Sequence, residues 1–211
     1  MLYGDGRTRK MPKFIGIGHK KQTGKSTFAE LLASRLSHLE TRIVSFAAPL
    51  KKLARDCYGL SYEQTDGDLK ETECHLTNLD LPSWVDEWGG KSNRINTTYH
   101  ITPRQLLQDL GLTLREAIPG IWSRAPFRGV YPDHVKYVII PDVRFEDELM
   151  FVRDRKGILI KVNRKIPEKD THVSEVELDA FEGWDIVVDN NGTLVELERE
   201  AGVVKEFIKN K

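Results

Sequence analysis

The chain has little cysteine and no long hydrophobic run. Of its 211 residues only Cys57 and Cys74 carry thiols, and neither belongs to a C-x-x-C or Cys/His ligand spacing. A disulfide framework or a zinc site is therefore not expected, and a reducing cytoplasm is the expected location. No apolar segment approaches the roughly 18 residues that span a bilayer, and the N-terminal MLYGDGRTRK lacks the apolar core of a signal peptide. We expect a soluble intracellular protein without a membrane partner.

The chain also lacks an excess of charge of either sign. Its 32 basic side chains balance 32 acidic ones, so no global positive field recruits nucleic acid. Stable nucleic-acid binding is not expected, and any site for a polyanion must be local. The sequence leaves open whether the protein is a monomer or a homodimer.

Apolar residues make up 39% of the chain, which is enough for one substantial core. Residues 1–12 are polar and aperiodic and predict a mobile leader, so residues 13–211 form the expected domain. Short β-branched runs then alternate with helical apolar spacing, which predicts an α/β fold with a mostly parallel central sheet flanked by helices. The expected strands are residues 14–18, 41–46, 135–140, 158–162 and 184–188, and the expected helices are residues 28–39, 50–57, 102–114, 144–155 and 194–208.

Residues 59–101 break this alternation. They are polar and carry Trp84, Trp88 and the pair Gly89-Gly90. A stretch of this length without a clear pattern is more typical of a functional insertion than of a core element. We expect an inserted subdomain here that covers the substrate.

The string GHKKQTGKST at residues 18–27 lies between the first expected strand and the first expected helix. Its end, Gly24-Lys25-Ser26, matches the phosphate-binding pattern G-x-x-x-x-G-K-[ST] in the context that this loop requires. The first glycine of the pattern falls on His19, while Gly18 lies one place early. Either the loop is one residue longer, or His19 adopts the required backbone angle. The alternative is an ordinary turn.

Such a loop acts through its main chain. The amides of residues 20–26 would converge at a helix N-terminus and bind the β-phosphate of ATP. Lys25 would bridge the β- and γ-phosphates as a catalytic residue, and Ser26 would offer its hydroxyl to Mg²⁺. ATP and Mg²⁺ are therefore the expected cofactors.

The most apolar expected strand ends at Pro141-Asp142. Ligands of open α/β sheets bind at the carboxyl ends of the strands, so Asp142 would hold a water molecule of Mg²⁺. Alternatively, Asp142 caps the helix that begins near Arg144, and the two roles are compatible.

A kinase whose acceptor already carries a phosphate must bring two polyanions together, and it needs further cations, ideally arginine. Lys51 and Arg55 lie four residues apart on one expected helical face. Further candidates are Arg104, Arg124, Arg128 and Arg144. For each of them a solvated surface charge is an equally good explanation.

Residues 170–175, DTHVSE, concentrate hydrogen-bonding groups after the basic stretch 163–165. Ser174 and Glu177 have the spacing of a capping box, which accounts for part of this polarity. His172 and Glu175 have no further ligands in their neighbourhood of the sequence, so a metal site is not expected there.

Five stretches in order resemble the bacteriophage-type deoxynucleoside monophosphate kinases: GHKKQTGKST, SFAAPLKKLA, TPRQLLQDLG, IIPDVRFEDE, and DTHVSE followed by DIVVDNNGTLVELE. Together they cover most of the chain outside residues 1–12 and 59–101. The resemblance implies a P-loop kinase fold. It also implies an enzyme that makes deoxynucleoside diphosphates from ATP and deoxynucleoside monophosphates for DNA synthesis, in the host cytoplasm if the protein is viral.

The resemblance places Lys25 and Ser26 at the ATP phosphates. The other residues expected to bind ATP are His19, Lys20, Thr23, Gly24, Thr27 and Arg164. The residues that the resemblance implies at the monophosphate or the transferred group are Phe46, Lys51, Arg104, Asp142, Arg144, Asp170, His172 and Glu175. Among them Asp142 and Arg144 are the expected catalytic residues, and the basic candidates Arg55 and Arg128 join the expected substrate site.

Three other functions stay open. A small P-loop kinase acting on a sugar, shikimate or dephospho-coenzyme A would have the same ATP half, although the many basic residues after the second strand favour a phosphorylated acceptor. A P-loop NTPase motor is less favoured because Val143, and not a carboxylate, follows Asp142, and because a neutral chain offers no DNA track. A binding module with a vestigial loop is the third, although Lys25 and Ser26 are intact. The accepted bases stay open as well.

Overall fold

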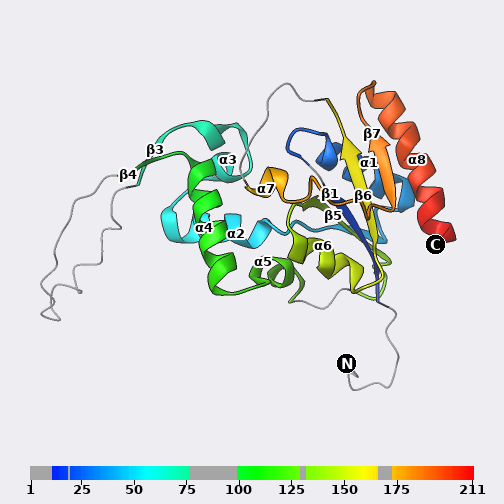
Figure 1. The fold of residues 1–211 in the computed structure, drawn as a ribbon, viewed down its shortest axis with the longest axis horizontal. Helices are drawn as coiled ribbons and strands as arrows, with labels where there is room; N and C mark the ends of the chain where they lie inside the picture. The colour runs from blue at the N-terminus through cyan, green and yellow to red at the C-terminus, as the bar shows by residue number, and fades with distance from the viewer. Residues whose placement is uncertain (1–10, 19, 77–98, 129–131, 166–172) are drawn as a thin grey trace, which may run out of the picture. The chain divides into compact units, whose positions relative to one another are not determined.

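The computed structural model describes residues 11–18, 20–76, 99–128, 132–165 and 173–211 (Figure 1). The chain folds into two compact units. Unit 1 comprises Met1–Ala47 and Trp122–Lys211, and unit 2 comprises Ala48–Ile121. Each unit has its own cluster of buried apolar side chains. The expected insertion, residues 59–101, falls within unit 2.

Unit 1 is built on a parallel sheet. In the described part of the chain this sheet has five strands, in the order β2-β5-β1-β6-β7, and every pairing between them is parallel. They are β1 (Lys13–Gly18), β2 (Thr41–Ile43), β5 (Tyr137–Val143), β6 (Ile158–Asn163) and β7 (Ile186–Asp189). The predicted α/β fold with a parallel central sheet is confirmed. The second strand is shorter than the expected 41–46, because residues 45–47 leave the sheet to bond with Asp142.

Helices cover both faces of this sheet, as Figure 1 shows for α1, α6 and α8. On one face α1 (Lys25–Leu36) and α8 (Leu194–Asn210) pack on side chains such as Ile15, Ile139 and Ile160. On the other face α6 (Glu146–Arg153) packs on their sequence neighbours, such as Val138 and Leu159. Successive residues of a strand point to opposite faces, so strands covered on both sides read as continuous apolar runs. Each such buried side chain contributes about 1.5–3 kcal/mol of transfer free energy.

The first helix is shorter than its apolar pattern predicts. Helix α1 ends at Leu36, where the N–H of Ser37 donates to the carbonyl of Ala33 at 3.0 Å. Leu39 lies beyond this end and is 81% exposed, so it does not belong to the core face as predicted. The remaining short helices that include unit 1 residues are α5 (Ile121–Arg124), η3 (Ala125–Phe127) and α7 (Val173–Val176).

Unit 2 is mainly helical. Its elements are α2 (Ala48–Tyr58), α3 (Tyr62–Thr65), η1 (Asp68–Glu71), the antiparallel strands β3 (Cys74–Leu76) and β4 (Tyr99–Ile101), and α4 (Pro103–Ala117). Thr102 caps α4 through a capping box with Gln105, and Pro103 occupies the first turn, so the predicted start of this helix is confirmed. Ala54, Leu60 and Leu106 form the buried centre of the unit.

Both cysteines lie in unit 2 and are unpaired. Cys57 is exposed on α2, while Cys74 is partly buried and directs its thiol to the carbonyl of Ile101 at 3.1 Å. Burial, the largest cause, raises the pKa of the Cys74 thiol. Among the described helices, none combines the length and the apolar character needed to cross a membrane.

Candidate active site

The loop between β1 and α1 lies at the carboxyl edge of the sheet, between Gly18 and Lys25. Gly24, the residue before the helix, has a φ of 89°, which glycine adopts without the steric cost that a side chain would bring. A Cβ at this position would also lie 2.3 Å from Nδ2 of Asn190. The second glycine of the predicted phosphate pattern is therefore required both by its backbone angle and by its surroundings.

Lys25 is held within this loop. The residue is only 6% exposed, and its ammonium group donates to the main-chain carbonyl of Lys20. The hydroxyl of Thr23 donates to the same carbonyl at 3.0 Å. One carbonyl thus orients two of the side chains that the sequence assigned to ATP binding.

Asn190 supports the loop from the neighbouring edge of the sheet, and the sequence analysis missed it. Its Nδ2 donates to the carbonyl of Thr23 at 2.8 Å, and its main-chain N–H donates to the carbonyl of Asn163 at 2.8 Å. The residue is 7% exposed. The available signal was its position directly after a β-branched strand, because the carboxyl ends of parallel strands meet at one edge.

Position 18 requires glycine because its surroundings leave no space for a side chain. A Cβ there would lie 2.4 Å from the indole ring of Trp184 and 2.9 Å from the carbonyl oxygen of Val143. Real Cβ atoms do not approach backbone so closely, so any larger residue would displace the strand end or the indole. The early glycine is thus explained by the close contact between β1, β5 and Trp184. His19, which takes the first glycine position of the pattern, lies outside the described residues.

The start of α1 has the features of an anion site. The first N–H groups of a helix have no partner within it and carry partial positive charge. Within the described residues of α1, the first turn contains no acidic side chain that would compete for them. Ser26 and Thr27 are exposed in this turn. The helix N-terminus therefore presents donors and two hydroxyl side chains beside the buried Lys25.

Two other residues were assigned to ATP: Lys20 belongs to the phosphate loop, where its carbonyl accepts from Thr23 and Lys25, and Arg164 follows β6. The ammonium of Lys20 is 2.9 Å from Oδ2 of Asp179, and both side chains are more than a third exposed. Arg164 is exposed directly after β6. Their roles in ATP binding stay predictions.

Asp142 lies at an irregularity of the central strands. Gly16 pairs with Ile140, but Gly18 pairs with Val143, so β5 has one residue more than β1 between these pairs. The extra length falls at Pro141, which has no N–H to donate to a ladder. Such bulges turn a side chain away from its regular direction.

The carboxylate of Asp142 binds the segment after β2. It accepts hydrogen bonds from the hydroxyl of Ser45 at 2.6 Å and from the N–H groups of Phe46 and Ala47 at 3.0 and 2.9 Å. The alternative role as a helix cap is wrong. The amides before α6 are instead bound by Glu148, which accepts from Arg144 N at 2.9 Å and from Phe145 N at 3.2 Å.

Ser26 and Asp142, the residues that the sequence assigned to Mg²⁺, offer oxygen ligands, which this ion prefers. A carboxylate has about four acceptor positions, and the three donors on Asp142 leave one for a water molecule. Ser26 offers an exposed hydroxyl, and Mg²⁺ commonly keeps several waters beside few protein oxygens. The described residues contain no group of three or more His, Cys, Asp and Glu side chains that could hold a metal without a nucleotide.

The residues assigned to the acceptor are scattered in unit 1. Phe46 is 1% exposed, and its ring packs against those of Phe127 and Phe151 with centroids 5.7 Å apart in each case. Only its main chain, which bonds to Asp142, is available to the site. Arg128 is exposed, and Arg144 is partly buried.

The stretch 170–175 is mostly outside the described residues. This holds for Asp170 and His172 and for the side chain of Glu175, whose main chain lies in α7. Ser174 and Glu177 do not form the predicted capping box, because α7 begins before Ser174 and ends before Glu177. Oε1 of Glu177 instead accepts the N–H of Glu146 at 2.8 Å. It links α7 to the start of α6.

Unit 2 brings two predicted cations to one point. Lys51 Nζ lies 2.9 Å from Oδ1 of Asp66, and Arg55 Nη1 lies 2.8 Å from Oδ2 of the same carboxylate. Arg55 also donates to the hydroxyl of Thr65 at 2.8 Å. The predicted common face of α2 is confirmed, but its counter-ion Asp66 was not foreseen because it comes from the turn after α3.

Two more cations lie near this group. The ammonium of Lys70 donates to the main-chain carbonyl of Asp66 at 2.8 Å. Arg104, at the start of α4, forms an ion pair with Glu71. Desolvation by burial, followed by the positive charge of Lys51, lowers the pKa of Lys70 below its ordinary 10.5, and Arg104 adds to this effect. We call Lys51, Arg55, Asp66, Lys70 and Arg104 the cation cluster.

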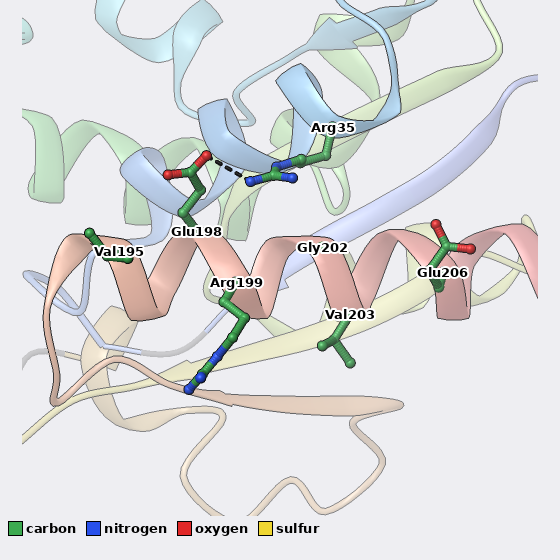
Figure 2. A pocket seen from close by; sticks show the side chains of 7 residues that line it. All are labelled: Arg35, Val195, Glu198, Arg199, Gly202, Val203 and Glu206. Carbon is green, nitrogen blue, oxygen red and sulfur yellow. Dashed lines mark hydrogen bonds and ion pairs between the residues drawn. The ribbon is translucent and has the colours of Figure 1, made fainter.

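A hollow of about 540 Å³ lies on the surface of α8. Figure 2 shows Arg35 of α1 reaching Glu198 at 2.7 Å, while Arg199 and Val203 point to the opposite side of α8. The hollow is lined by Arg35, Val195, Glu198, Arg199, Gly202, Val203 and Glu206. None of the residues assigned to ATP or to the acceptor lines it.

Two comparisons of the sequence with known proteins name the same activity. The sequence profile of the family described as deoxynucleotide monophosphate kinase matches residues 88–201. A protein of Acanthamoeba polyphaga mimivirus, provisionally named deoxynucleotide monophosphate kinase, is 36% identical over 196 residues, which cover 86% of this chain and 90% of that protein.

Solved structures add no argument. Shikimate kinase from Aquifex aeolicus vf5 matches with a TM-score of 0.41 and 14% identity, over 93% of this chain and 97% of its own. A provisionally named plasmid partition protein from Borrelia burgdorferi B31, bound to AMPPNP, matches with a TM-score of 0.37 and 15% identity, over 95% of this chain and 100% of its own. These TM-scores are too low to support a statement about function.

Proposed function

The chain belongs to the deoxynucleotide monophosphate kinase family, and we propose that it transfers the γ-phosphoryl group of ATP to a deoxynucleoside monophosphate. The product is the deoxynucleoside diphosphate, a precursor for DNA synthesis. The enzyme class, a nucleoside monophosphate kinase, follows from the family. The use of ATP, the dependence on Mg²⁺ and the role in DNA synthesis are the proposed part.

One observation carries the ATP half of the proposal: Lys25 is buried inside a glycine-ended loop at the N-terminus of α1. Its ammonium already has a main-chain carbonyl as partner, that of Lys20. An anion bound by the loop would compete for the same ammonium and be favoured over the neutral carbonyl, because opposite charges attract each other at this short range. The arrangement orients the lysine before the nucleotide arrives.

In the proposed reaction the protein mainly positions and stabilises charge. The main-chain N–H groups at the start of α1 hold the β-phosphate, and Lys25 stabilises the negative charge on the transferring group. Ser26 and Asp142 would hold Mg²⁺, which when bound neutralises phosphate charge. Arg144 would contact the transferred group, as the family resemblance implies.

The acceptor half rests on the cation cluster of unit 2. Lys51 and Arg55 share one carboxylate, so their combined charge is only half neutralised. A phosphomonoester supplies the missing negative charge, whereas a sugar or shikimate hydroxyl group does not. This favours a phosphorylated acceptor over the neutral small metabolites that the sequence left open.

The location and origin also stay proposals. Two unpaired cysteines fit a reducing cytoplasm. The curated relative comes from a giant virus of an amoeba, so a viral origin is consistent with it, while an origin in a bacteriophage is a prediction. The choice between monomer and homodimer stays open.

The test is an assay of ATP consumption coupled to ADP formation. It compares dAMP, dGMP, dCMP and dTMP with their ribose forms, and it includes a control without acceptor. We expect turnover that requires a deoxynucleoside monophosphate and Mg²⁺. Hydrolysis at the same rate without any acceptor would contradict the proposal and favour an NTPase module.

A further inference from the structure

Positive charge exceeds negative charge around one carboxylate of unit 2. Asp66 receives the ammonium of Lys51 on Oδ1 at 2.9 Å and the guanidinium of Arg55 on Oδ2 at 2.8 Å. A third cation, Lys70, binds the main-chain carbonyl of the same residue at 2.8 Å. Asp68 is a second carboxylate close enough to act on Lys70. Three cations and two carboxylates still leave one positive charge, so the cluster retains an affinity for a further anion.

The surroundings of Lys70 show how closely these cations lie. Burial is the largest cause that lowers the pKa of this lysine, and repulsion by Lys51 and Arg104 lowers it further, against the attraction of Asp66 and Asp68. A cation that is partly desolvated and repelled by its neighbours is stabilised strongly by an incoming dianion. Lys70 is thus better suited to bind a ligand than an isolated lysine on the surface.

Asp66 fixes the geometry of the other two cations. Its carboxylate also accepts the hydroxyl of Thr65 at 2.9 Å, so three side chains converge on it. Burial raises the pKa of Asp66, but hydrogen bonds from Lys51 and Thr65 and the nearby positive charges outweigh this and keep it below 3.8. Because Asp66 already orders Lys51 and Arg55, these side chains lose less conformational entropy when a ligand binds than they would without it.

Both held cations have unused donor capacity toward a ligand. An ammonium has three N–H donors and a guanidinium has five. Lys51 uses Nζ for one contact, to Asp66. Arg55 uses only Nη1 for its contacts to Thr65 and Asp66. A phosphate can therefore bind these cations while Asp66 remains in place.

We propose that Lys70 is a further ligand of the acceptor's phosphate and that Asp66 is the positioning residue that holds Lys51 and Arg55 for the same phosphate. This inference rests on the proposed function and adds two residues to its acceptor site. The ligand class is the dianionic monophosphate ester of a nucleoside. Asp66, Lys70 and the two α2 cations lie outside residues 88–201, the stretch that the family profile matches.

The first test concerns Lys70. Dissociation constants of the full chain for dAMP, dGMP, dCMP, dTMP and ATP are measured by isothermal titration calorimetry for the wild type, for Lys70→Ala and for Lys52→Ala. Lys52 is a matched control, because it lies on α2 beside the cluster but pairs with Asp56 and is 69% exposed.

We expect Lys70→Ala to weaken binding of the accepted monophosphates about tenfold, because a partly buried charge-assisted hydrogen bond to phosphate is lost. Binding of ATP, and all binding by Lys52→Ala, should stay within about twofold of the wild type. Monophosphate binding by Lys70→Ala equal to that of the wild type would overturn the role of Lys70. Equal weakening for ATP would also overturn it, since the effect would then not be specific to the acceptor.

The second test uses the sign of a charge change. Asp66→Asn removes a negative charge next to an anion site, so electrostatics alone predicts tighter binding of the monophosphates. The positioning role predicts the opposite, about fivefold weaker binding, because Lys51 and Arg55 lose the partner that orders them. Unchanged or tighter binding would overturn the role of Asp66.

Two further variants separate this role from a general loss of stability. Asp56→Asn, which removes the exposed partner of Lys52, should leave binding unchanged, and Asp66→Glu, which restores a carboxylate, should recover part of the affinity. If neither Asp66 variant folds, ATP binding fails together with monophosphate binding, and Lys70→Ala decides the inference. If the wild type binds and phosphorylates monophosphates but these variants do so equally well, only the inference fails. If the wild type binds no monophosphate, the proposed function fails.

Discussion

The phosphate loop of unit 1 and the cation cluster of unit 2 are both suited to bind phosphate, but they are built from different parts of the chain. The loop uses consecutive residues, and its donors are main-chain N–H groups with a single buried lysine, Lys25. The cluster uses side chains from α2, from the turn after α3, from η1 and from α4. A site made by the backbone depends on a local turn, whereas a site made by side chains depends on the packing of several helices.

This difference has a practical meaning for mutations. Among the three lysines of the loop, Lys20, Lys21 and Lys25, only Lys25 is buried, so its substitution alone should have a large effect. In the cation cluster several cations would contact the same phosphate, so each single substitution should have a moderate effect on binding. Asp66, which pairs with two of these cations, should contribute to both stability and binding.

The largest expected effect comes from Lys25→Ala. This change removes the buried charge at the transferring group and should lower phosphoryl transfer at least about a hundredfold, while the fold is kept. Turnover is measured by the coupled assay and the fold by thermal unfolding, with the exposed Lys209→Ala of α8 as a control. A Lys25→Ala enzyme that retains normal activity would show that the loop does not carry the chemistry.

The double substitution Lys51→Ala with Arg55→Ala is expected to raise the KM for the monophosphate roughly thirtyfold. Two charge-assisted hydrogen bonds are lost, although partial exposure weakens each of them. The KM for ATP should change by less than about threefold, because it depends on the loop. Steady-state kinetics with each substrate varied in turn provides the measurement, and an equal rise in both KM values would remove the distinction between the two sites.

Asn190→Ala should destabilise unit 1 by about 1–2 kcal/mol, because the buried carbonyl of Thr23 loses its donor. Urea unfolding provides the free energy. The control is Asn210→Ala at the exposed end of α8, which should stay within about 0.5 kcal/mol of the wild type. If both variants have the same stability, the loop does not depend on the end of β7.

The smallest expected effect is the pH dependence of the contribution of Asp66. Burial raises the pKa of this carboxyl, but hydrogen bonds from Lys51 and Thr65 and the nearby cations lower it further, so the folded value lies below 3.8. A group of this kind stabilises the folded state fully above its unfolded pKa, and the stabilisation is lost as the pH falls through the folded value. The difference in unfolding free energy between the wild type and Asp66→Asn should therefore be fully present at pH 7 and decrease as the pH falls below 3.8.

This difference should be below about 1 kcal/mol, as is typical of partly exposed ion pairs. Urea unfolding at pH 7, 5 and 3 measures it. A difference that is the same at all three values would mean that the charge of Asp66 does not act on stability.

The contrast between loop and cluster also explains what could be read from the sequence. The strand, loop and helix around Gly24 and Lys25 follow from local patterns, and so do the strands of the parallel sheet, because apolar runs and turn residues are local properties. The sequence also predicted correctly that Lys51 and Arg55 share a helical face. It could not predict Asp66 or Lys70 as their neighbours, since this requires knowledge of how α3 and η1 fold back on α2.

The errors have the same origin. Leu39 continues the apolar spacing of α1, but the helix ends three residues earlier, and no local signal marks this end clearly. Asp142 has the position of a helix cap, but the bulge at Pro141 turns its carboxylate toward residues 45–47. Asn190 is separated from the loop that it supports by more than 150 residues of sequence.

The contact between Gly18 and Trp184 has an evolutionary consequence. Since the indole ring leaves no space for even a methyl group at the end of β1, the two positions cannot vary independently. Lineages that retain a tryptophan or another large ring at position 184 should keep glycine at position 18. Where descent has replaced the ring by a small residue, the carbonyl oxygen of Val143 still lies 2.9 Å from a Cβ at this position, so alanine or serine should appear only where the end of β5 has shifted as well.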